Sequence, residues 1–417
     1  MSNTPPRRTM SLMTRSSSRR AVPAPSPVRL LLAPAAILLL ALAVPARARA
    51  DAPPPKPASG AAAAPAVPHA GSKDEAVVAA TLHLNRAAVL ARQGNLAEAE
   101  KELIEVDRIR PDYCPGLMQL STVRYRLDRK TAALADLERA IRKGSEFDDK
   151  AFLLAARILS EQRQFVEGQK KLAEWGGSRP VSANFHAAIG LLKLGALELG
   201  PAEVEMRRAL DIDPANDAAL GGMFQLYARL DQYAKLQPFL DRGLKANPRS
   251  QGILMLSGNC FMRLERWVEA KDRFERALAL DPKNAAALVN RGSAEHHLGE
   301  TKAAIEDYRK AIALDPKGVE APVNLATVLE AGGKYAEARD VLLAARGRGI
   351  KDLDVLNALS VAYDINGELD LAIATAKESL ERDASQETMR KHLAMLEGKK
   401  SAPRAPGVPA PKSPRGR

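Results

Sequence analysis

Histidine and cysteine side chains are the first candidates for metal binding in this sequence. His296 and His297 are the only adjacent histidines. Neighbouring residues of a helix point about 100° apart, so these two imidazoles cannot hold one metal ion as an i, i+4 pair can. The two cysteines, Cys114 and Cys260, have no C-x-x-C spacing, which gives no support to a metal or redox site. The sequence therefore predicts no metal site and no cofactor.

Catalytic signatures are equally hard to find. The sequence contains no glycine-rich loop ending in Lys-Ser or Lys-Thr, no H-E-x-x-H and no G-x-S-x-G. Its carboxylates stand at Glu-Lys and Glu-Arg spacings, such as Glu98 and Glu100 beside Lys101, which are typical of solvated helix faces. No carboxylate is expected to be isolated in an apolar pocket. We therefore predict no catalytic residue and no enzymatic activity.

The positive charge of the chain is concentrated at its two ends. The formal net charge of +12 first suggests a nucleic acid or an anionic membrane as partner. Residues 1–50 contain eight arginines and residues 399–417 contain six basic residues, with no acidic residue in either, which leaves a formal charge of −2 for residues 51–398. Because nucleic-acid binding needs a basic stripe that releases counterions, a nearly neutral body argues against a nucleic-acid partner.

Residues 1–50 have the pattern of a secretory signal peptide. Arginines are followed by an apolar run, Leu30 to Val44, and then by Ala48-Arg49-Ala50 before Asp51. This order matches a charged n-region, an apolar h-region and an A-x-A cleavage site. We expect an exported protein, periplasmic or secreted, whose mature chain begins at Asp51. The alternative is a membrane protein held by an uncleaved anchor at residues 30–46.

Two segments have the composition of disordered chain. Residues 51–79 form a linker rich in proline and alanine, and residues 399–417 form a basic tail rich in proline. Both lack apolar periodicity, so we expect both to be extended.

The strongest regularity of the sequence is a ladder of prolines. Pro180, Pro214, Pro248, Pro282 and Pro316 follow one another at a constant interval. Proline ends helices because it lacks the amide donor and clashes with the preceding turn. A constant interval of this length indicates one structural unit that ends at the same place each time.

Within one unit, small and large residues also recur at fixed offsets. In 285–318, Gly292 lies in a first helix, Gly299 ends it, and Ala304, Tyr308 and Ala311 lie in a second helix. This pattern resembles the tetratricopeptide repeat, a helix–turn–helix unit of about 34 residues. The resemblance implies an all-α, right-handed superhelical solenoid of about nine helix pairs at 80–386. A last apolar stripe at 387–398 is expected to form a capping helix.

Two units depart from the pattern. In 149–182, Trp175 stands at a position that is usually alanine, and we expect Gly168 to make room for it. In 217–250, Pro238 is expected to interrupt the second helix. The cysteines fall in separate units and cannot form a disulfide within one chain. Cys260 is expected in the core, whereas Cys114, at a turn, leaves pairing between two chains open.

The resemblance also implies where a partner binds, because the first helices of tetratricopeptide stacks line a concave groove. Basic residues recur at one offset of that groove, and softer apolar and polar residues stand beside them. The expected partner is another protein, through an acidic or mixed acidic and apolar peptide. The alternative is that the basic residues only favour helix ends and solubility. The expected binding residues are Gln225, Arg229, Met255, Asn259, Met262, Arg263, Val289, Ser293, His296 and His297.

The sequence leaves three candidate functions to compare. The first is a scaffold of the bacterial cell envelope that binds partner proteins, and the second is a periplasmic chaperone or a regulatory accessory subunit of a separate enzyme. The third, a nucleic-acid-associated protein, is opposed by both the signal pattern and the neutral body. The carboxylate clamp by which some tetratricopeptide proteins hold chaperone tails is incomplete, because Asn259 and Asn290 match it but Met255 replaces its lysine.

Overall fold

The computed structural model describes residues 73–144, 148–177, 182–350 and 352–401. These residues form helices and contain no β-strand. A short 3₁₀ helix, η1 (Tyr233–Lys235), and a final helix, α20 (Glu387–Ser401), accompany a series of helix pairs. The pairs are α2 (Lys73–Gln93) with α3 (Leu96–Ile109), α4 (Cys114–Arg126) with α5 (Lys130–Lys143), α6 (Asp148–Glu161) with α7 (Phe165–Gly176), α8 (Ala183–Gly195) with α9 (Leu199–Ile212), α10 (Asp217–Leu230) with α11 (Gln237–Ala246), α12 (Gln251–Arg263) with α13 (Trp267–Leu280), α14 (Ala285–His297) with α15 (Thr301–Leu314), α16 (Glu320–Ala331) with α17 (Tyr335–Gly347), and α18 (Leu353–Ile365) with α19 (Leu369–Arg382).

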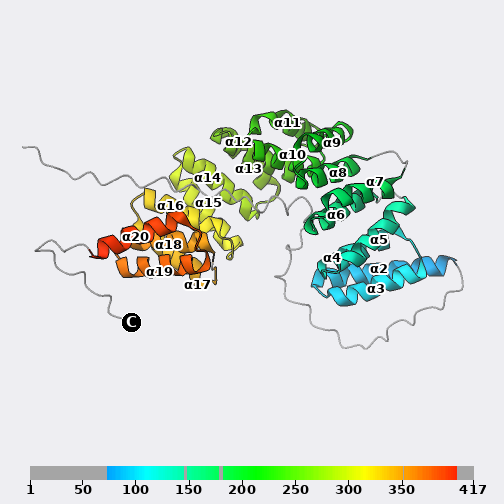
Figure 1. Cartoon of the computed structure of the whole chain (residues 1–417), viewed down its shortest axis with the longest axis horizontal. Helices are drawn as coiled ribbons and strands as arrows, with labels where there is room; N and C mark the ends of the chain where they lie inside the picture. Colours follow the sequence, from blue (N-terminus) through cyan, green and yellow to red (C-terminus); the bar gives the residue numbers. More distant parts are fainter. Residues whose placement is uncertain (1–72, 145–147, 178–181, 351, 402–417) are drawn as a thin grey trace, which may run out of the picture.

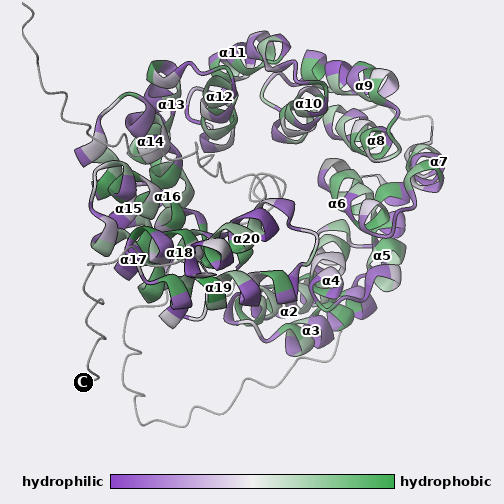
Figure 2. Cartoon of the chain, turned by 60° about the vertical axis from the view of Figure 1, so that its left-hand side comes forward, coloured by the Kyte–Doolittle hydropathy of each residue, from purple (hydrophilic) through white to green (hydrophobic). Residues whose placement is uncertain are grey.

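The pairs stack side by side into a curved solenoid. Figure 1 shows the pairs following one another in chain order, with α2 and α20 far apart at the two ends of the stack. In Figure 2 the same stack curves round on itself, with first helices such as α6, α8, α10 and α12 on the inside and second helices such as α7, α9, α11 and α13 on the outside. The predicted all-α superhelical repeat fold is confirmed.

Helix caps explain why the unit repeats at a constant interval. Ser182, Asn216, Ser250 and Asn284 each stand two residues after a proline of the ladder and precede the first helix of a pair. Each side-chain oxygen accepts a hydrogen bond from the backbone N–H three residues later, at 2.9–3.2 Å. Such a cap stabilises a helix by about 1 kcal/mol. Proline therefore ends one helix, and the cap starts the next.

Small residues set the distance between the two helices of a pair. A side chain added at Gly258 of α12 would lie 2.5 Å from the ring of Phe274 in α13, and one at Gly292 of α14 would lie 3.0 Å from the ring of Tyr308 in α15. Phe274 and Tyr308 are completely buried. The glycine of the first helix thus makes room for the large side chain of the second.

Both ends of the solenoid extend beyond the limits expected from the sequence. Helix α2 begins at Lys73, inside the segment 51–79 that was predicted to be a linker. Residues 73–79 contain no proline or glycine, so nothing in them stops the helix. Helix α20 continues to Ser401, into the predicted tail, and there Lys399 and Lys400 form ion pairs with Asp364 and Asp370 of the last repeat.

The two irregular units differ from the prediction in detail. Pro238 does not interrupt a helix: α11 begins at Gln237, so the proline lies in the first turn, where its missing N–H costs nothing. The second helix is instead shortened, and η1 fills the space before it. Trp175 is buried, but the room at Gly168 is taken by Leu159 and Leu192.

In the part of the chain that the structure describes, no helix combines the length and the apolar character needed to cross a bilayer. The expected signal peptide, with its apolar run, lies outside the described residues, as does most of the basic tail.

Candidate protein-binding face

The candidate site is the inner face of the curve, which the first helices line (Figure 2). The structure places the ten expected residues on α10, α12 and α14, but it divides them into two groups. Met255, Asn259, Met262, Val289 and Ser293 are buried, with at most 7% of each residue exposed. Arg229, Arg263 and His297 are exposed, and Gln225 and His296 are half-buried. The expectation that the methionines form a soft binding surface is therefore wrong, because both side chains belong to the hydrophobic core.

The buried polar residues of this group connect adjacent repeats. Asn290 donates a hydrogen bond from Nδ2 to Oδ1 of Asn259 at 2.9 Å, which joins α14 to α12. Ser293 donates to the carbonyl of Val289 and shares a second hydrogen bond, of 3.1 Å, with the hydroxyl of Tyr308. Buried polar groups are costly unless they are paired. These hydrogen bonds therefore help to fix the register of the stack, while Nδ2 of Asn259 and Oδ1 of Asn290 are buried without a hydrogen-bond partner among the described residues.

The exposed basic residues lie along one edge of the inner face. Arg229 is the penultimate residue of α10, Arg263 is the last of α12 and His297 is the last of α14, so all three stand beside the turns that join the helices of a pair. Arg229 donates a hydrogen bond from Nη1 to the carbonyl of Leu194 at 3.3 Å, near the end of α8.

Arg126 makes the corresponding contact with the carbonyl of Ala91 at 3.1 Å. The last carbonyls of a helix are unsatisfied and carry partial negative charge, so an arginine stabilises them. Arg126 and Arg229 therefore support the ends of helices in the preceding repeat. Their exposure leaves both guanidinium groups open to solvent as well.

Arg263 and His297 rest on aromatic rings of the preceding repeat. The guanidinium carbon of Arg263 lies 5.3 Å from the ring centre of Tyr233. The imidazole of His297 stacks on the indole of Trp267, with ring centroids 4.0 Å apart and an angle of 5° between the planes. The Trp267 ring covers one face of the imidazole, and this partial burial lowers the pKa of His297; the neighbouring His296 lowers it further. His297 is therefore neutral at pH 7, and the arginines carry the permanent charge of this edge.

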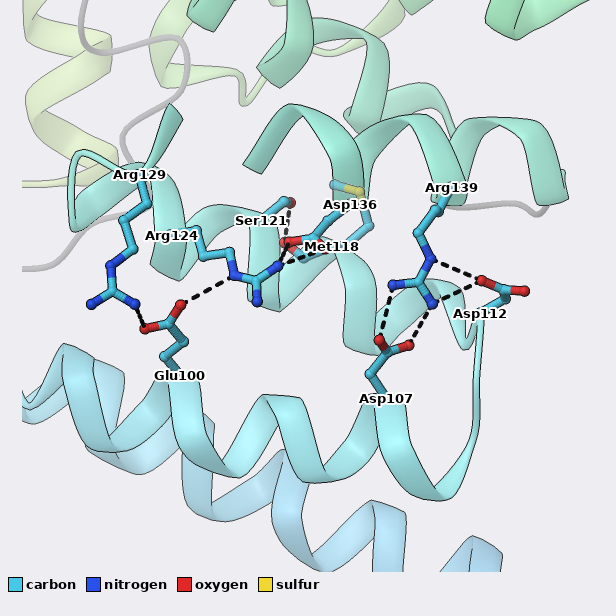
Figure 3. Close-up of polar contacts among 9 residues, drawn as sticks. All are labelled: Glu100, Asp107, Asp112, Met118, Ser121, Arg124, Arg129, Asp136 and Arg139. Atoms are coloured by element: carbon cyan, nitrogen blue, oxygen red, sulfur yellow. Dashed lines mark hydrogen bonds and ion pairs between the residues drawn. The ribbon is translucent and has the colours of Figure 1, made fainter. Parts of the chain in front are cut away.

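Several carboxylates are buried, which the sequence did not reveal. Glu100 was expected on a solvated face, yet it is only 5% exposed and accepts hydrogen bonds from Arg124 and Arg129. Arg124 also binds both oxygens of Asp136 at 2.8 Å, so it joins α3, α4 and α5 (Figure 3). Burial raises the pKa of Asp136, and the charge of Arg124 opposes that change.

The right-hand side of Figure 3 shows a similar contact between α5 and the first repeat. Arg139 binds both oxygens of Asp107 at 2.8 and 2.9 Å and one oxygen of Asp112 at 3.0 Å. These acids were hard to recognise because their partners lie in other helices, at separations of 24 residues or more for Glu100 with Arg124 and Asp107 with Arg139. Each acid has a cation beside it, so the network is suited to holding repeats together.

Glu330 is the carboxylate that departs most clearly from the expectation that no acid is isolated. Burial alone raises its pKa to about 7, because no cation lies close enough to favour the charged form. Glu295 behaves similarly: burial and the charge of Asp307 raise its pKa to about 7, and Arg291 opposes them.

The cysteines are both buried and free. Cys260 lies in the core, as expected, and burial raises the pKa of its thiol to about 12. Cys114 is the first residue of α4, and its sulfur lies 3.9 Å from the carbonyl of Ala140. It faces the neighbouring helix, so pairing between two chains is not open to it. No group of three histidine, cysteine or acidic side chains in the described residues is arranged to hold a metal ion.

Comparison with known proteins gives matches at two levels. Models of the tetratricopeptide repeat match residues 257–319 and 295–360, which include α13 to α17. No curated protein matches the chain. Among solved structures, the APC/C hetero-tetramer Cut9–Hcn1 is similar with a TM-score of 0.48 and 16% identity, over 75% of this chain and 62% of that one. This chain thus spans less than two thirds of that protein.

Two further structures are similar. A tetratricopeptide repeat protein from Parabacteroides merdae has a TM-score of 0.47 and 16% identity, over 60% of this chain and 98% of its own. PilW, a type IV pilus biogenesis factor, has a TM-score of 0.45 and 21% identity, over 51% of this chain and 98% of its own. The chain carries tetratricopeptide repeats, and such repeats generally bind other proteins, which makes it a protein-interaction scaffold.

Proposed function

We propose that this chain is an exported scaffold that binds an acidic segment of a partner protein along the turn edge of its inner face, at repeats 217–318. The observation that carries the proposal is the alignment of Arg229, Arg263 and His297, which are exposed and held in place by the preceding repeat. Side chains that are already fixed lose less entropy when they bind a partner.

Charge dominates this proposed contact more than the sequence suggested. Met255, Met262 and Val289 belong to the core, so they offer little apolar area to a partner. Exposed charges mainly steer and orient a partner, and salt screens them over about 10 Å at 0.1 M. We therefore expect an affinity that falls strongly as salt rises, and a preference for partners with carboxylates spaced along an extended segment.

Charge reversal tests this proposal. Proteins captured from an envelope extract by the mature chain are compared with those captured by Arg229→Glu plus Arg263→Glu. A matched control, Lys245→Glu plus Arg249→Glu, changes the net charge equally at exposed positions at the end of α11 and just after it. We expect the first variant to lose specific partners that wild type and control retain, with all three equally helical. The same set of captured proteins in all three would refute the site.

Calorimetry with a retained partner then measures the effect directly. Reversing two exposed charges at one contact is expected to weaken binding about tenfold to a hundredfold, since each screened pair contributes about 1 kcal/mol or somewhat more. The variant Arg229→Gln plus Arg263→Gln keeps polar donors and removes the charge. An intermediate affinity for it indicates that charge, and not the support of helix ends, is what the partner senses.

The exported location is supported by the sequence of residues 1–50 alone. N-terminal sequencing of protein from the native cell is expected to begin at Asp51, and fractionation to find it outside the cytoplasm. An intact Met1 in the membrane fraction would favour the anchor at residues 30–46, and an intact Met1 in the soluble cytoplasm would contradict export.

A further inference from the structure

The first helix of the solenoid leaves an apolar stripe uncovered. Val78, Leu82 and Val89 of α2 lie on one face of the helix and are 68%, 42% and 50% exposed. Together with Asn85, Arg86, Leu90 and Glu102, Leu82 and Val89 line a shallow hollow of about 440 Å³. We call the surface formed by Val78, Leu82, Arg86, Val89 and Glu102 the α2 stripe.

In later repeats, a preceding repeat covers the positions that correspond to this stripe. In three later first helices the residues at the positions of Leu82 and Val89 are buried, namely Ile253 and Cys260, Ala287 and Ala294, and Val355 and Ala362. They are buried because a preceding repeat packs over them. Leu82 and Val89 stand at the same contact positions, and no helix of the described residues precedes α2, so the described part of the chain leaves this helix–helix contact unfilled.

The other end of the solenoid is closed by the chain itself. Helix α20 covers α19 through the buried Met389 and Leu396, and Lys377 and Glu397 pair across the contact at 2.9 Å. In the sequence just before α2, residues 53–68 lack the pattern of such a helix. Six prolines lie between residues 53 and 68, and proline cannot continue a helix.

The charges beside the stripe indicate which partner fits it. Arg86 and Glu102 line the same hollow, and Arg86 has no ion pair within the described part of the chain. One carboxylate oxygen of Glu102 accepts a hydrogen bond from His83 at 2.6 Å, which leaves the other oxygen for a cation. A partner of single charge sign would leave one of the two unpaired. A second copy related by a two-fold axis presents Glu102 to Arg86 and Arg86 to Glu102 at once.

From these observations we infer that the α2 stripe is the interface of a homodimer, in which the α2 helices of two chains pack against each other. Helix α2 has 21 residues and is therefore about 31 Å long, which allows contact over several turns. The interface lies on the first repeat, whereas the proposed partner-binding residues lie on α10, α12 and α14. Its existence does not depend on the partner-binding role proposed above.

Light scattering after size-exclusion chromatography measures the mass of the protein purified from cells that express the full sequence. We expect twice the chain mass at tens of micromolar and the mass of one chain after dilution. Leu82→Glu plus Val89→Glu is expected to give one chain at every concentration, with an unchanged helical circular dichroism spectrum. The control Val166→Glu plus Val268→Glu alters valines that are 56% and 65% exposed on α7 and α13, and it should remain dimeric.

A charge exchange tests the pairing itself. Arg86→Glu and Glu102→Arg should each give monomers, because each places like charges across the axis. When the two variants are mixed, both ion pairs are restored, and a heterodimer is expected. A monomeric wild type, a dimer that survives Leu82→Glu plus Val89→Glu, or a chain that dimerises only after residues 1–72 are removed would each overturn the inference. The last result would mean that the preceding segment covers the stripe.

Discussion

The imidazole of His297 stacks face to face on the indole of Trp267, with ring centroids 4.0 Å apart. His297 ends the first helix of one repeat and Trp267 begins the second helix of the repeat before it. The same two positions meet elsewhere: Arg263 lies over the ring of Tyr233, and the ring of Phe165 fills the space where Gly195 has no side chain. An aromatic residue before or at the start of a second helix, with a flat or small residue at the end of the next first helix, therefore marks a contact between repeats.

The stack of His297 on Trp267 predicts a pH-dependent fluorescence signal. In a Trp175→Phe chain, Trp267 is the only tryptophan, and protonation of His297 is expected to quench its emission. Because burial lowers the pKa of His297, the midpoint should lie below about 6.5, the ordinary value for histidine. The variant His297→Leu should lose the transition. A midpoint above the ordinary value would contradict burial as the controlling effect.

The lowered pKa of His297 also determines whether its contribution to stability rises or falls with pH. The folded chain holds His297 with a lowered pKa, so the unfolded chain takes up a proton at a higher pH. The contribution of this group is therefore complete above about pH 6.5 and is lost as the pH falls through the lowered pKa. Urea denaturation should show a smaller loss of unfolding free energy between pH 7 and about pH 5 in His297→Leu than in wild type.

The carboxyl group of Glu330 should make stability depend on pH in the opposite direction. Burial raises its pKa to about 7, far above about 4.3 in an unfolded chain. Its favourable contribution is thus complete below about pH 4.3 and is lost as the pH rises through 7. Glu330→Gln cannot ionise, so it should exceed wild type by about 2 kcal/mol at pH 8 and equal it near pH 4. The exposed Glu381→Gln is the control and should change stability little at either pH.

Replacing Arg124 should cause a large loss of stability from a single substitution. Arg124→Met leaves Glu100 and Asp136, which are 5% and 2% exposed, without the cation between them. Breaking a buried ion pair by removing one partner costs about 3–5 kcal/mol. The control Arg108→Met removes an exposed pair with Glu105, which contributes at most about 1 kcal/mol. Hydrogen exchange should show that the loss is confined to the first repeats, since a solenoid is stabilised locally.

The repeat could be predicted from the sequence because residues close together in the chain mark where each helix ends and the next begins. The prolines from Pro180 to Pro316 mark helix ends, and Ser182, Asn216, Ser250 and Asn284 cap the helices that follow. The prediction for Pro238 was wrong because a proline that breaks a helix interior is well placed in a first turn, and the start of α11 was not recognised in the sequence. Its place in the first turn of α11 follows from η1, which depends on the burial of Tyr233 and Leu236.

The candidate site was harder to predict than the fold. The helical offset correctly brings Arg229, Arg263 and His297 to one edge, since it depends only on helix geometry. The burial of Met255, Met262 and Val289 depends on how closely neighbouring repeats approach, and that distance is set by packing between helices. The partners of Glu100 and Asp136 lie across repeats or helices, so no local spacing reveals them.

The last prediction concerns two glycines with the same residue change and opposite outcomes. Gly258 and Gly221 both lie inside first helices, α12 and α10. A Cβ at Gly258 would meet three atoms of the buried Phe274 ring at 2.5–2.9 Å, whereas a Cβ at Gly221 would meet nothing within 4 Å. Gly258→Ala should therefore destabilise the chain by about 1–3 kcal/mol, because the ring has no space to move. Gly221→Ala should stabilise it by up to about 1 kcal/mol, because alanine favours the helix. Urea denaturation of both variants measures the difference.

The double variant Gly258→Ala plus Phe274→Leu should recover part of the loss, because the shorter side chain vacates the space that the new methyl group needs. Equal effects at both glycines would show that helix propensity, and not the approach of α12 to α13, determines where this repeat requires a small residue.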